Sequence, residues 1–402
     1  MNPQVEAALI AGIVSLISLG GTVMVAFIGF RTTRSVTGST LAEQRTRTLN
    51  ERFATAAGQL GSDESSAVRL AGVYAMAGLA DDWPENRQTC VDVLCGYLRM
   101  PYEPDPGDEA PEKKRLAFRT SREVRHTVIR VITAHLKDGA TPSWQGLYFD
   151  FRGVVFDGAD FTGAEFSRGT LDFRGAIFSG GMVNFGGATF SGGTLDFSDA
   201  TFSSGTVRIG ATFSGGTIDF HRAEFSGGRV EFTGPNSFHG ATFSGGTIDF
   251  TGATFSGGTV SFAVAEFSRG TIDFTVANLS GGTVNFNTLQ ISGGTIDFSL
   301  AEFSSSTVIS FNDAKISGGT VDFSGADLSG GTVSFRSAKF SGGRVDFDGA
   351  AFSGGMLDLD NAEFSGGTAD FSNISDWSFP PKFAWVDKPP LGVKLPKQED
   401  PT

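Results

Sequence analysis

The chain has few of the residues that build metal centres, disulfide frameworks and nucleophilic active sites. Its 402 residues include two cysteines, four histidines, four tyrosines and four tryptophans. Cys90 and Cys95 stand five apart in a helix-like stretch, so we expect two packed, reduced thiols that point away from each other. Neither a Ser-His-Asp context nor a phosphate loop of the G-x-x-x-x-G-K type is found. The sequence therefore predicts a protein that is not an enzyme, with no metal site and no cofactor.

Basic residues are fewer than acidic ones, and the imbalance falls in one part of the chain. Lysine and arginine number 31 and aspartate and glutamate 44, which gives a net charge of −13. Through residue 138 the chain holds 16 basic and 16 acidic residues, so the whole negative excess lies after that point. An acidic surface repels nucleic acid and attracts cations or basic protein faces. We therefore predict no nucleic-acid partner.

One long apolar run stands near the start of the sequence. Residues 7–30 contain no charged side chain, and roughly 20 apolar residues suffice to cross the hydrocarbon core of a bilayer. A secretory signal would begin with basic residues, but the start MNPQVE has none, and the basic residues follow the run instead. The positive-inside rule then predicts a single-pass helix in the cell membrane, with the N-terminus outside and all that follows in the cytoplasm. The basic residues that set this orientation are Arg31, Arg34, Arg45 and Arg47.

Residues 31–142 are predicted to form a small, cytoplasmic, all-α domain. Four of its segments place apolar residues at three- and four-residue spacing, as helices with one buried face do. A proline-rich, charged stretch over residues 101–115 is expected to be a loop. Two interpretations stay open for this domain: a stack of helices packed at the membrane-proximal end, or a docking domain for a partner.

Phenylalanine and glycine, by contrast, are abundant, with 39 and 55 residues. From Phe166 to Phe371 an apolar anchor recurs at alternating spacings of seven and five residues, which gives a twelve-residue unit of the form A-x-F-S-G-G-T-I-D-F-x-x. A fixed period over more than half of a chain is the signature of a solenoid.

The start of the repeats carries a family resemblance. Anchors there are spaced by five residues, and residues 159–163 read A-D-F-T-G. This segment resembles the pentapeptide-repeat family, whose unit is A-(D/N)-L-x-x with Leu or Phe at the centre, here as a membrane-anchored variant with a twelve-residue double repeat of the kind seen in actinobacteria. The resemblance implies a mainly β fold, a right-handed quadrilateral β-helix over residues 143–373, and it implies no particular activity. The anchors spaced by five are Phe151, Phe156, Phe161 and Phe166.

The residue before each second anchor sets the length of one coil. It is aspartate in alternate repeats, whereas the intervening repeats have mostly Asn, Ser or Glu there. Two repeats therefore make one coil of about 24 residues with four faces, and about nine coils stacked roughly 4.8 Å apart make a rod of about 45 Å. The aspartates of the alternate repeats are Asp172, Asp196, Asp219, Asp249, Asp273, Asp297, Asp322, Asp346 and Asp370.

This aspartate column is the candidate interaction face. Adjacent carboxylates about 4.8 Å apart repel by roughly 1 kcal/mol in water, so the array would attract divalent cations or a basic protein. The alternative is that each aspartate is solvated, accepts hydrogen bonds from a neighbouring threonine or from corner amides, and discourages aggregation.

A second candidate contact is an insertion of six residues after Phe232. The aspartate alternation continues unbroken past it, which predicts a loop that bulges from a corner, with Pro235, Asn236 and His239 at its tip. A neutral insertion is the alternative.

Both ends of a solenoid need cover, because an open end leaves strands unpaired. Trp144 and the helical domain are expected to close the first coil. Residues 374–402 are predicted to be a C-terminal cap and proline-rich tail, in which Trp377, Phe379, Phe383 and Trp385 can close the last coil.

These features favour a non-catalytic, membrane-anchored scaffold that presents an acidic β-helix face to a protein partner. Two alternatives remain. The family resemblance suggests a rod that imitates DNA and binds a type II topoisomerase. A reversed topology would make the rod a surface-exposed adhesin or cation-binding protein. The partner and the oligomeric state stay open.

Overall fold

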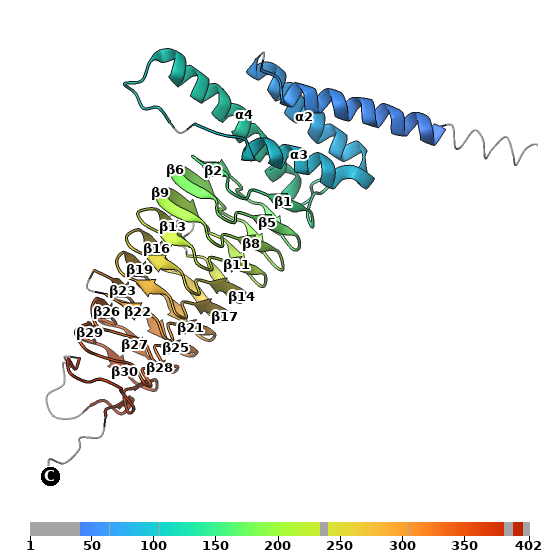
Figure 1. Ribbon diagram of the computed structural model, residues 1–402. Helices are drawn as coiled ribbons and strands as arrows, with labels where there is room; N and C mark the ends of the chain where they lie inside the picture. The colour runs from blue at the N-terminus through green and yellow to red at the C-terminus, as the bar shows by residue number, and fades with distance from the viewer. Residues whose placement is uncertain are drawn as a thin grey trace, which may run out of the picture.

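The computed structural model describes residues 41–63, 65–103, 105–233, 240–304, 306–381 and 389–396. A helical region is followed by a long, parallel β-solenoid (Figure 1). The predicted membrane span over residues 7–30 lies outside the described residues. Within the described ranges, no helix is both long enough and apolar enough to cross a bilayer.

The helical region confirms the small all-α unit expected before the repeats. A first helix covers residues 41–60. The hydroxyl of Ser65 accepts a hydrogen bond from the Val68 amide and so caps α2. Apolar side chains on one face of each following helix are buried together, among them both cysteines. The following elements are α2 (Ser66–Asp82), the 3-10 helix η1 (Pro84–Asn86), α3 (Arg87–Arg99) and α4 (Glu112–Leu136).

These helices cover the first coil of the solenoid, which Trp144 and the helical domain were predicted to close. The indole of Trp144 is fully buried and stacks on the ring of His135, with centroids 4.0 Å apart. Its Nε1 donates to Asp81 Oδ1 at 3.0 Å, and His135 Nε2 lies 3.2 Å from Asp81 Oδ2. A second contact comes from α4, where the Arg125 guanidinium donates to the Val155 carbonyl in β2.

The solenoid consists of two parallel sheets. The larger contains β1 (Tyr148–Asp150), β4 (Glu165–Phe166), β5 (Thr170–Asp172), β7 (Thr189–Phe190), β8 (Thr194–Asp196), β10 (Thr212–Phe213), β11 (Thr217–Asp219), β14 (Thr242–Asp249), β17 (Glu266–Asp273), β20 (Gln290–Ile291), β21 (Thr295–Asp297), β24 (Lys315–Ile316), β25 (Thr320–Asp322), β27 (Lys339–Phe340), β28 (Arg344–Asp346), β30 (Glu363–Phe364), β31 (Thr368–Asp370) and β32 (Val393–Lys394). The smaller contains β2 (Val155–Phe156), β3 (Ala159–Asp160), β6 (Ile177–Asn184), β9 (Thr201–Arg208), β12 (Glu224–Phe225), β13 (Arg229–Glu231), β15 (Thr254–Phe255), β16 (Thr259–Ser261), β18 (Asn278–Leu279), β19 (Thr283–Asn285), β22 (Glu302–Phe303), β23 (Val308–Ser310), β26 (Thr332–Ser334) and β29 (Met356–Asp358).

Strand register confirms a coil of 24 residues. Phe166 pairs with Phe190, and Phe243 pairs with Phe267. Across the insertion the register jumps from Phe213 to Phe243, and an antiparallel bridge between residues 233 and 240 closes the inserted segment. The coil register thus continues past the insertion, as predicted. The proposed contact residues of the insertion, Pro235, Asn236 and His239, lie outside the described residues.

The core is built from columns of stacked phenylalanine rings. One column runs through the whole solenoid without a break, and neighbouring ring centroids in it are 4.5–5.1 Å apart. Parallel strands stacked about 4.8 Å apart place identical side chains at that spacing, so ring stacking follows directly from the repeat. The column consists of Phe151, Phe173, Phe197, Phe220, Phe250, Phe274, Phe298, Phe323, Phe347 and Phe371.

The glycine-rich S-G-G-T segments are part of continuous strands in four places. In β6, β9, β14 and β17 a single eight-residue strand runs through the segment, so the four faces join into two sheets. Glycine is required there by stacking: at Gly246, with φ +85°, a Cβ would lie 2.9 Å from the Gly215 and Gly216 carbonyl oxygens of the preceding coil.

The sharp turns fall at the two-residue corners between a phenylalanine and the next alanine. The second corner residue adopts a left-handed backbone, and nine of these residues are not glycine, with φ between 51° and 57°. Such values are uncommon for non-glycine residues and strained for branched ones. The nine are Asp199, Arg222, Val264, Val276, Thr288, Leu300, Asp313, Ser337 and Asn361.

The C-terminal end is closed in part as predicted. Trp377 packs against Phe352 and Phe371, with ring centroids 5.5 and 5.9 Å away. Phe379 was expected to join this cap, but its side chain is 59% exposed, although its backbone N–H donates to the Phe352 carbonyl at 2.9 Å. Phe383 and Trp385 lie outside the described residues.

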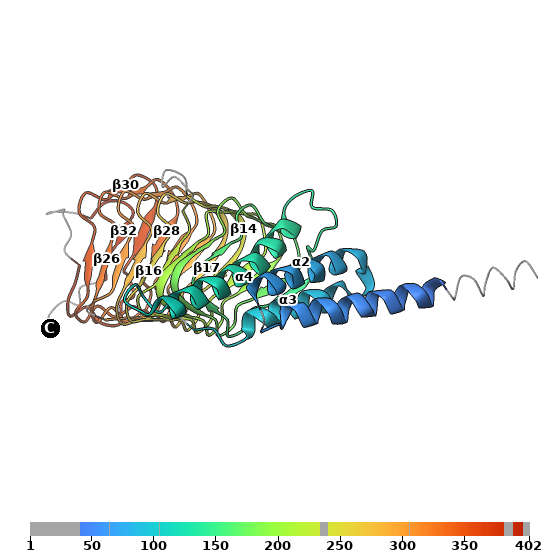
Figure 2. The ribbon, with the colours of Figure 1, turned by 90° about the horizontal axis from the view of Figure 1, so that it is seen from above.

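The molecule is elongated. Helix 41–60 and the C-terminal end of the solenoid lie at opposite ends (Figures 1 and 2).

Candidate interaction face: the aspartate ladder

The nine aspartates singled out from the repeat pair in register along the larger sheet. Asp150 of β1 precedes them, and Lys394 of β32 follows Asp370, so the row has eleven rungs. We call this row the aspartate ladder. It spans about ten turns, one more than the sequence predicted. The sequence count missed the two end strands, because β1 precedes the regular twelve-residue spacing and β32 lies in the proline-rich tail.

A local turn holds every aspartate of the ladder in the same pose. Each carboxylate accepts a hydrogen bond from the backbone N–H two residues later, at 2.8–3.3 Å. Asn184 and Asn285 make the same contact in the smaller sheet through their amide oxygens, at 3.0 and 2.9 Å. The turn therefore needs a side-chain oxygen and does not need a charge.

Both ends of the ladder are neutralised by basic side chains. At the first end, Arg152 pairs with Asp150 at 2.9 Å, and Arg174 pairs with Asp172 at 2.6 Å. At the last end, Lys394 pairs with Asp370 at 2.9 Å. The Arg152 hydrogen bond lowers the pKa of Asp150 to about 2. Burial acts to raise the pKa of Asp370, but hydrogen bonds from Ser372 and Lys394 lower it to about 2.

The central rungs have no such neutralisation. Ion pairs within the described ranges engage only Asp150, Asp172, Asp196, Asp346 and Asp370 of the ladder. Burial, together with the charges of the two adjacent rungs, raises the pKa of Asp219. The five rungs without an ion pair among the described residues are Asp219, Asp249, Asp273, Asp297 and Asp322.

Two exposed apolar side chains lie on the corners directly after these rungs. Val276 and Leu300 are 49% and 58% exposed. They stand on successive coils, since the Val276 amide donates to Ser299 and the Leu300 amide to Ser324 in the next coil. Sequence analysis missed them. The available signal was an apolar residue at a corner position that elsewhere holds Gly, Asp or Ser.

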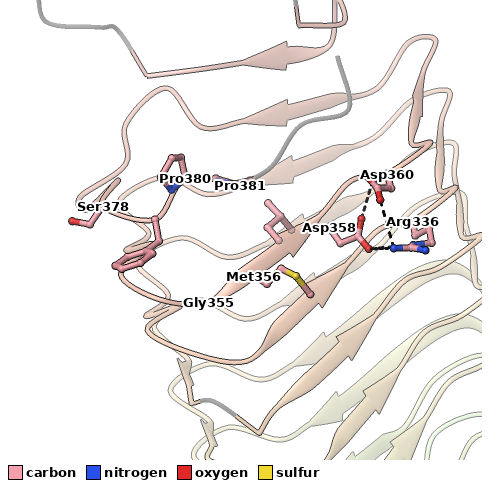
Figure 3. A pocket seen from close by; sticks show the side chains of 10 residues that line it. Arg336, Gly355, Met356, Asp358, Asp360, Ser378, Pro380 and Pro381 are labelled. Atoms are coloured by element: carbon pink, nitrogen blue, oxygen red, sulfur yellow. Dashed lines mark hydrogen bonds and ion pairs between the residues drawn. The ribbon is translucent and has the colours of Figure 1, made fainter. Parts of the chain in front are cut away.

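A hollow at the C-terminal end has a volume of about 450 Å³ (Figure 3). Its one basic residue, Arg336, is engaged by Asp358 at 2.9 Å and Asp360 at 3.5 Å. Met356, Pro380 and other apolar groups form much of the remaining wall. Across the parts of the chain that the structure describes, no three His, Cys, Asp or Glu side chains are grouped to hold a metal ion.

The fold and the ladder together define a repeat protein of the parallel β-solenoid class. The family model for pentapeptide repeats, with nine copies, matches residues 151–201 and 318–363. Repeats of the pentapeptide-repeat family are therefore present in these two stretches of the chain. Proteins of this family are generally non-catalytic. No curated protein and no solved structure matches the chain.

Proposed function

We propose that this protein is a non-catalytic scaffold whose central aspartate ladder binds a basic surface of a partner protein. The proposal rests on one observation, the difference in ion pairing between the ends and the centre of the ladder. The protein neutralises both ends with its own arginines and a lysine, and it leaves five successive rungs between them without an ion pair to a described residue. A partner that supplies the missing cations would relieve the repulsion between adjacent rungs.

The spacing of the rungs favours a basic helix as the partner element. Basic residues three and four positions apart on a helix are about 5–6 Å apart, close to the roughly 4.8 Å between rungs. Alternate residues of an extended strand lie nearly 7 Å apart, which does not match the spacing of the rungs. Val276 and Leu300, beside the central rungs, would add apolar contact, which exposed charge pairs need because each contributes at most about 1 kcal/mol.

The proposed scaffold also includes the predicted membrane anchor. Residues 7–30 would cross the cell membrane once, with the repeats in the cytoplasm. In support, helix 41–60 lies at the end of the molecule opposite the C-terminal coils (Figure 2), so a tether at the N-terminus would leave the ladder open. The DNA-imitating alternative is less well supported, because the ladder carries one charge per roughly 4.8 Å against one per about 1.7 Å in duplex DNA.

Neutral variants of the central rungs test the binding face. Asp249, Asp273, Asp297 and Asp322 would be changed together to Asn, which keeps the turn acceptor and removes four charges. Capture from membranes with the full chain should lose a partner that the wild type retains.

The matched control changes four exposed acidic residues away from the ladder to Gln. Because it removes the same net charge, equal loss of the partner in both variants would refute a ladder-specific face. Retention of the partner in the Asn variant would refute it as well. The control residues are Glu224, Glu266, Glu302 and Glu363.

Membrane topology needs an introduced thiol. Cys90 and Cys95 are fully buried, and burial raises their pKa values to about 11 and about 12, so neither reacts readily. An impermeant maleimide should label Glu302→Cys only after cell lysis and Gln4→Cys in intact cells. Labelling of Glu302→Cys in intact cells would place the solenoid outside and support the adhesin alternative.

A further inference from the structure

A cavity in the helical region has a charge opposite to that of the ladder. Its volume is about 360 Å³, and small-molecule sites begin at about 300 Å³. It lies between the turn after helix 41–60, helices α2, α3 and α4, and the segment that follows α3. The polar residues that line it are Ser62, Asp63, Arg69, Tyr97, Tyr102, Ser121 and Arg125.

Arg125 brings a buried positive charge to this cavity. Its side chain is 5% exposed, and its guanidinium donates to the carbonyl oxygens of Leu98 at 2.6 Å and Val155 at 2.9 Å. The guanidinium also lies 4.1 Å from the ring centroid of Tyr102. Carbonyl groups and a ring face do not cancel a full charge. Within the described ranges Arg125 has no carboxylate in ion-pair distance. Asp157 attracts it from farther away, and that carboxylate is itself engaged by Arg122, His126 and Tyr102.

Arg69 brings a second guanidinium with unused donors. Its Nη1 donates to the Ser62 carbonyl at 3.0 Å, and the side chain shares a hydrogen bond with the Tyr97 hydroxyl. Its Nε is buried and finds no hydrogen-bond partner in the described part of the chain. A buried donor without an acceptor is unfavourable, and a bound anion would supply that acceptor.

We propose that this cavity binds a phosphate monoester. A dianionic phosphate matches two guanidinium groups in charge, and guanidinium N–H groups suit phosphate oxygens in geometry. The hydroxyls of Tyr97 and Ser121 add donors. The cavity is larger than a phosphate group, so the esterified part has room beside Tyr102 and Met100. Free phosphate esters and lipid headgroups share this chemistry.

Titration calorimetry on the full chain in mild detergent tests the site and separates the two sources. The probes are inorganic phosphate, glycerol 3-phosphate and dihexanoyl phosphatidic acid. Saturable binding of both esters supports a site for free phosphate esters, and binding of the lipid alone supports a headgroup site. Binding of no probe, or of inorganic phosphate alone, overturns the proposal.

Variants tie the binding to the cavity. Arg69→Met should weaken ester binding about tenfold or more, the loss of one charge-assisted contact. The exposed Arg119 of α4 serves as the control, because Arg119→Met removes the same charge outside the cavity. Asp63→Asn should tighten binding and Ser121→Ala should weaken it, which keeps the test decisive if Arg69→Met does not fold. Equal losses in both Met variants would show non-specific attraction and overturn the site.

Discussion

Replacing Phe250 by alanine would cut the uninterrupted phenylalanine column near its middle. The ring is fully buried and stacks on Phe220 at 4.7 Å and on Phe274 at 4.5 Å, with tilted contacts to Phe225 and Phe255 at 6.0 and 6.1 Å. A buried Phe→Ala change costs about 3–5 kcal/mol, and each lost aromatic pair adds about 0.5–1.5 kcal/mol. The two stacked pairs together add about 1–3 kcal/mol, so we expect a loss of about 4–8 kcal/mol in the free energy of unfolding.

Guanidinium unfolding of the full chain in detergent, followed by far-ultraviolet circular dichroism, measures this loss. Each coil contacts only its neighbours, so the broken column should also reduce the slope of the transition as the two halves unfold separately. Phe250→Leu provides a graded comparison, since Leu279, Leu328 and Leu359 occupy anchor positions in this chain. It keeps an apolar side chain in the core but loses the two stacked pairs, so it should cost about 1–3 kcal/mol.

Phe379→Ala is the matched control, because its side chain is 59% exposed, and it should change stability by no more than about 0.5 kcal/mol. A loss below about 1 kcal/mol for Phe250→Ala, which is far under the usual cost of emptying a core site, would refute the reasoning. It would mean that the stacked rings contribute little to the solenoid.

Further predictions concern the ladder and the corners. Asp370→Asn should cost about 2 kcal/mol at neutral pH, because this carboxyl has its pKa lowered from 3.8 to about 2; thermal unfolding should show the difference from wild type vanish as the pH falls through that range. Asp219→Asn should stabilise the protein at neutral pH and have no effect in acid, because burial and like-charged neighbours raise the pKa of Asp219. Val276→Gly should stabilise by up to about 1 kcal/mol by relieving a left-handed backbone. Gly246→Ala should cost about 1–3 kcal/mol, because its Cβ would meet carbonyl oxygens of the preceding coil. Opposite signs in these unfolding measurements would contradict the assigned causes.

Periodicity explains why so much of this fold could be predicted. Once the coil length is known, the position of a residue in the repeat fixes its face and its neighbours in the coils above and below. Phe166 opposite Phe190, the coil register that continues past the insertion and the row of aspartates all follow from counting. The helical region was predictable for a different reason, because spacing of three and four residues marks a buried helix face.

The shape of the coil was less predictable than its length. The S-G-G-T segments look like corners in the sequence because they are rich in glycine. In the structure they stack on the same segment of the coil before, and four of the strands continue through them. Glycine is needed there because the backbones of successive coils come too close for a Cβ. The sequence alone does not distinguish such a glycine from one that is needed in a turn.

The sequence alone determined the solenoid, its 24-residue period and the row of aspartates, because these depend on contacts that repeat at one fixed separation. Only the tertiary structure decided which aspartates at the ends of the ladder are ion-paired. Arg99 of α3 reaches Asp150, and Lys394 of the tail reaches Asp370, through contacts that no period encodes. The cavity of Arg69 and Arg125 likewise exists only where separate helices meet. The repeat determines the solenoid, and the non-repeating segments at its two ends determine which aspartates of the ladder are ion-paired there.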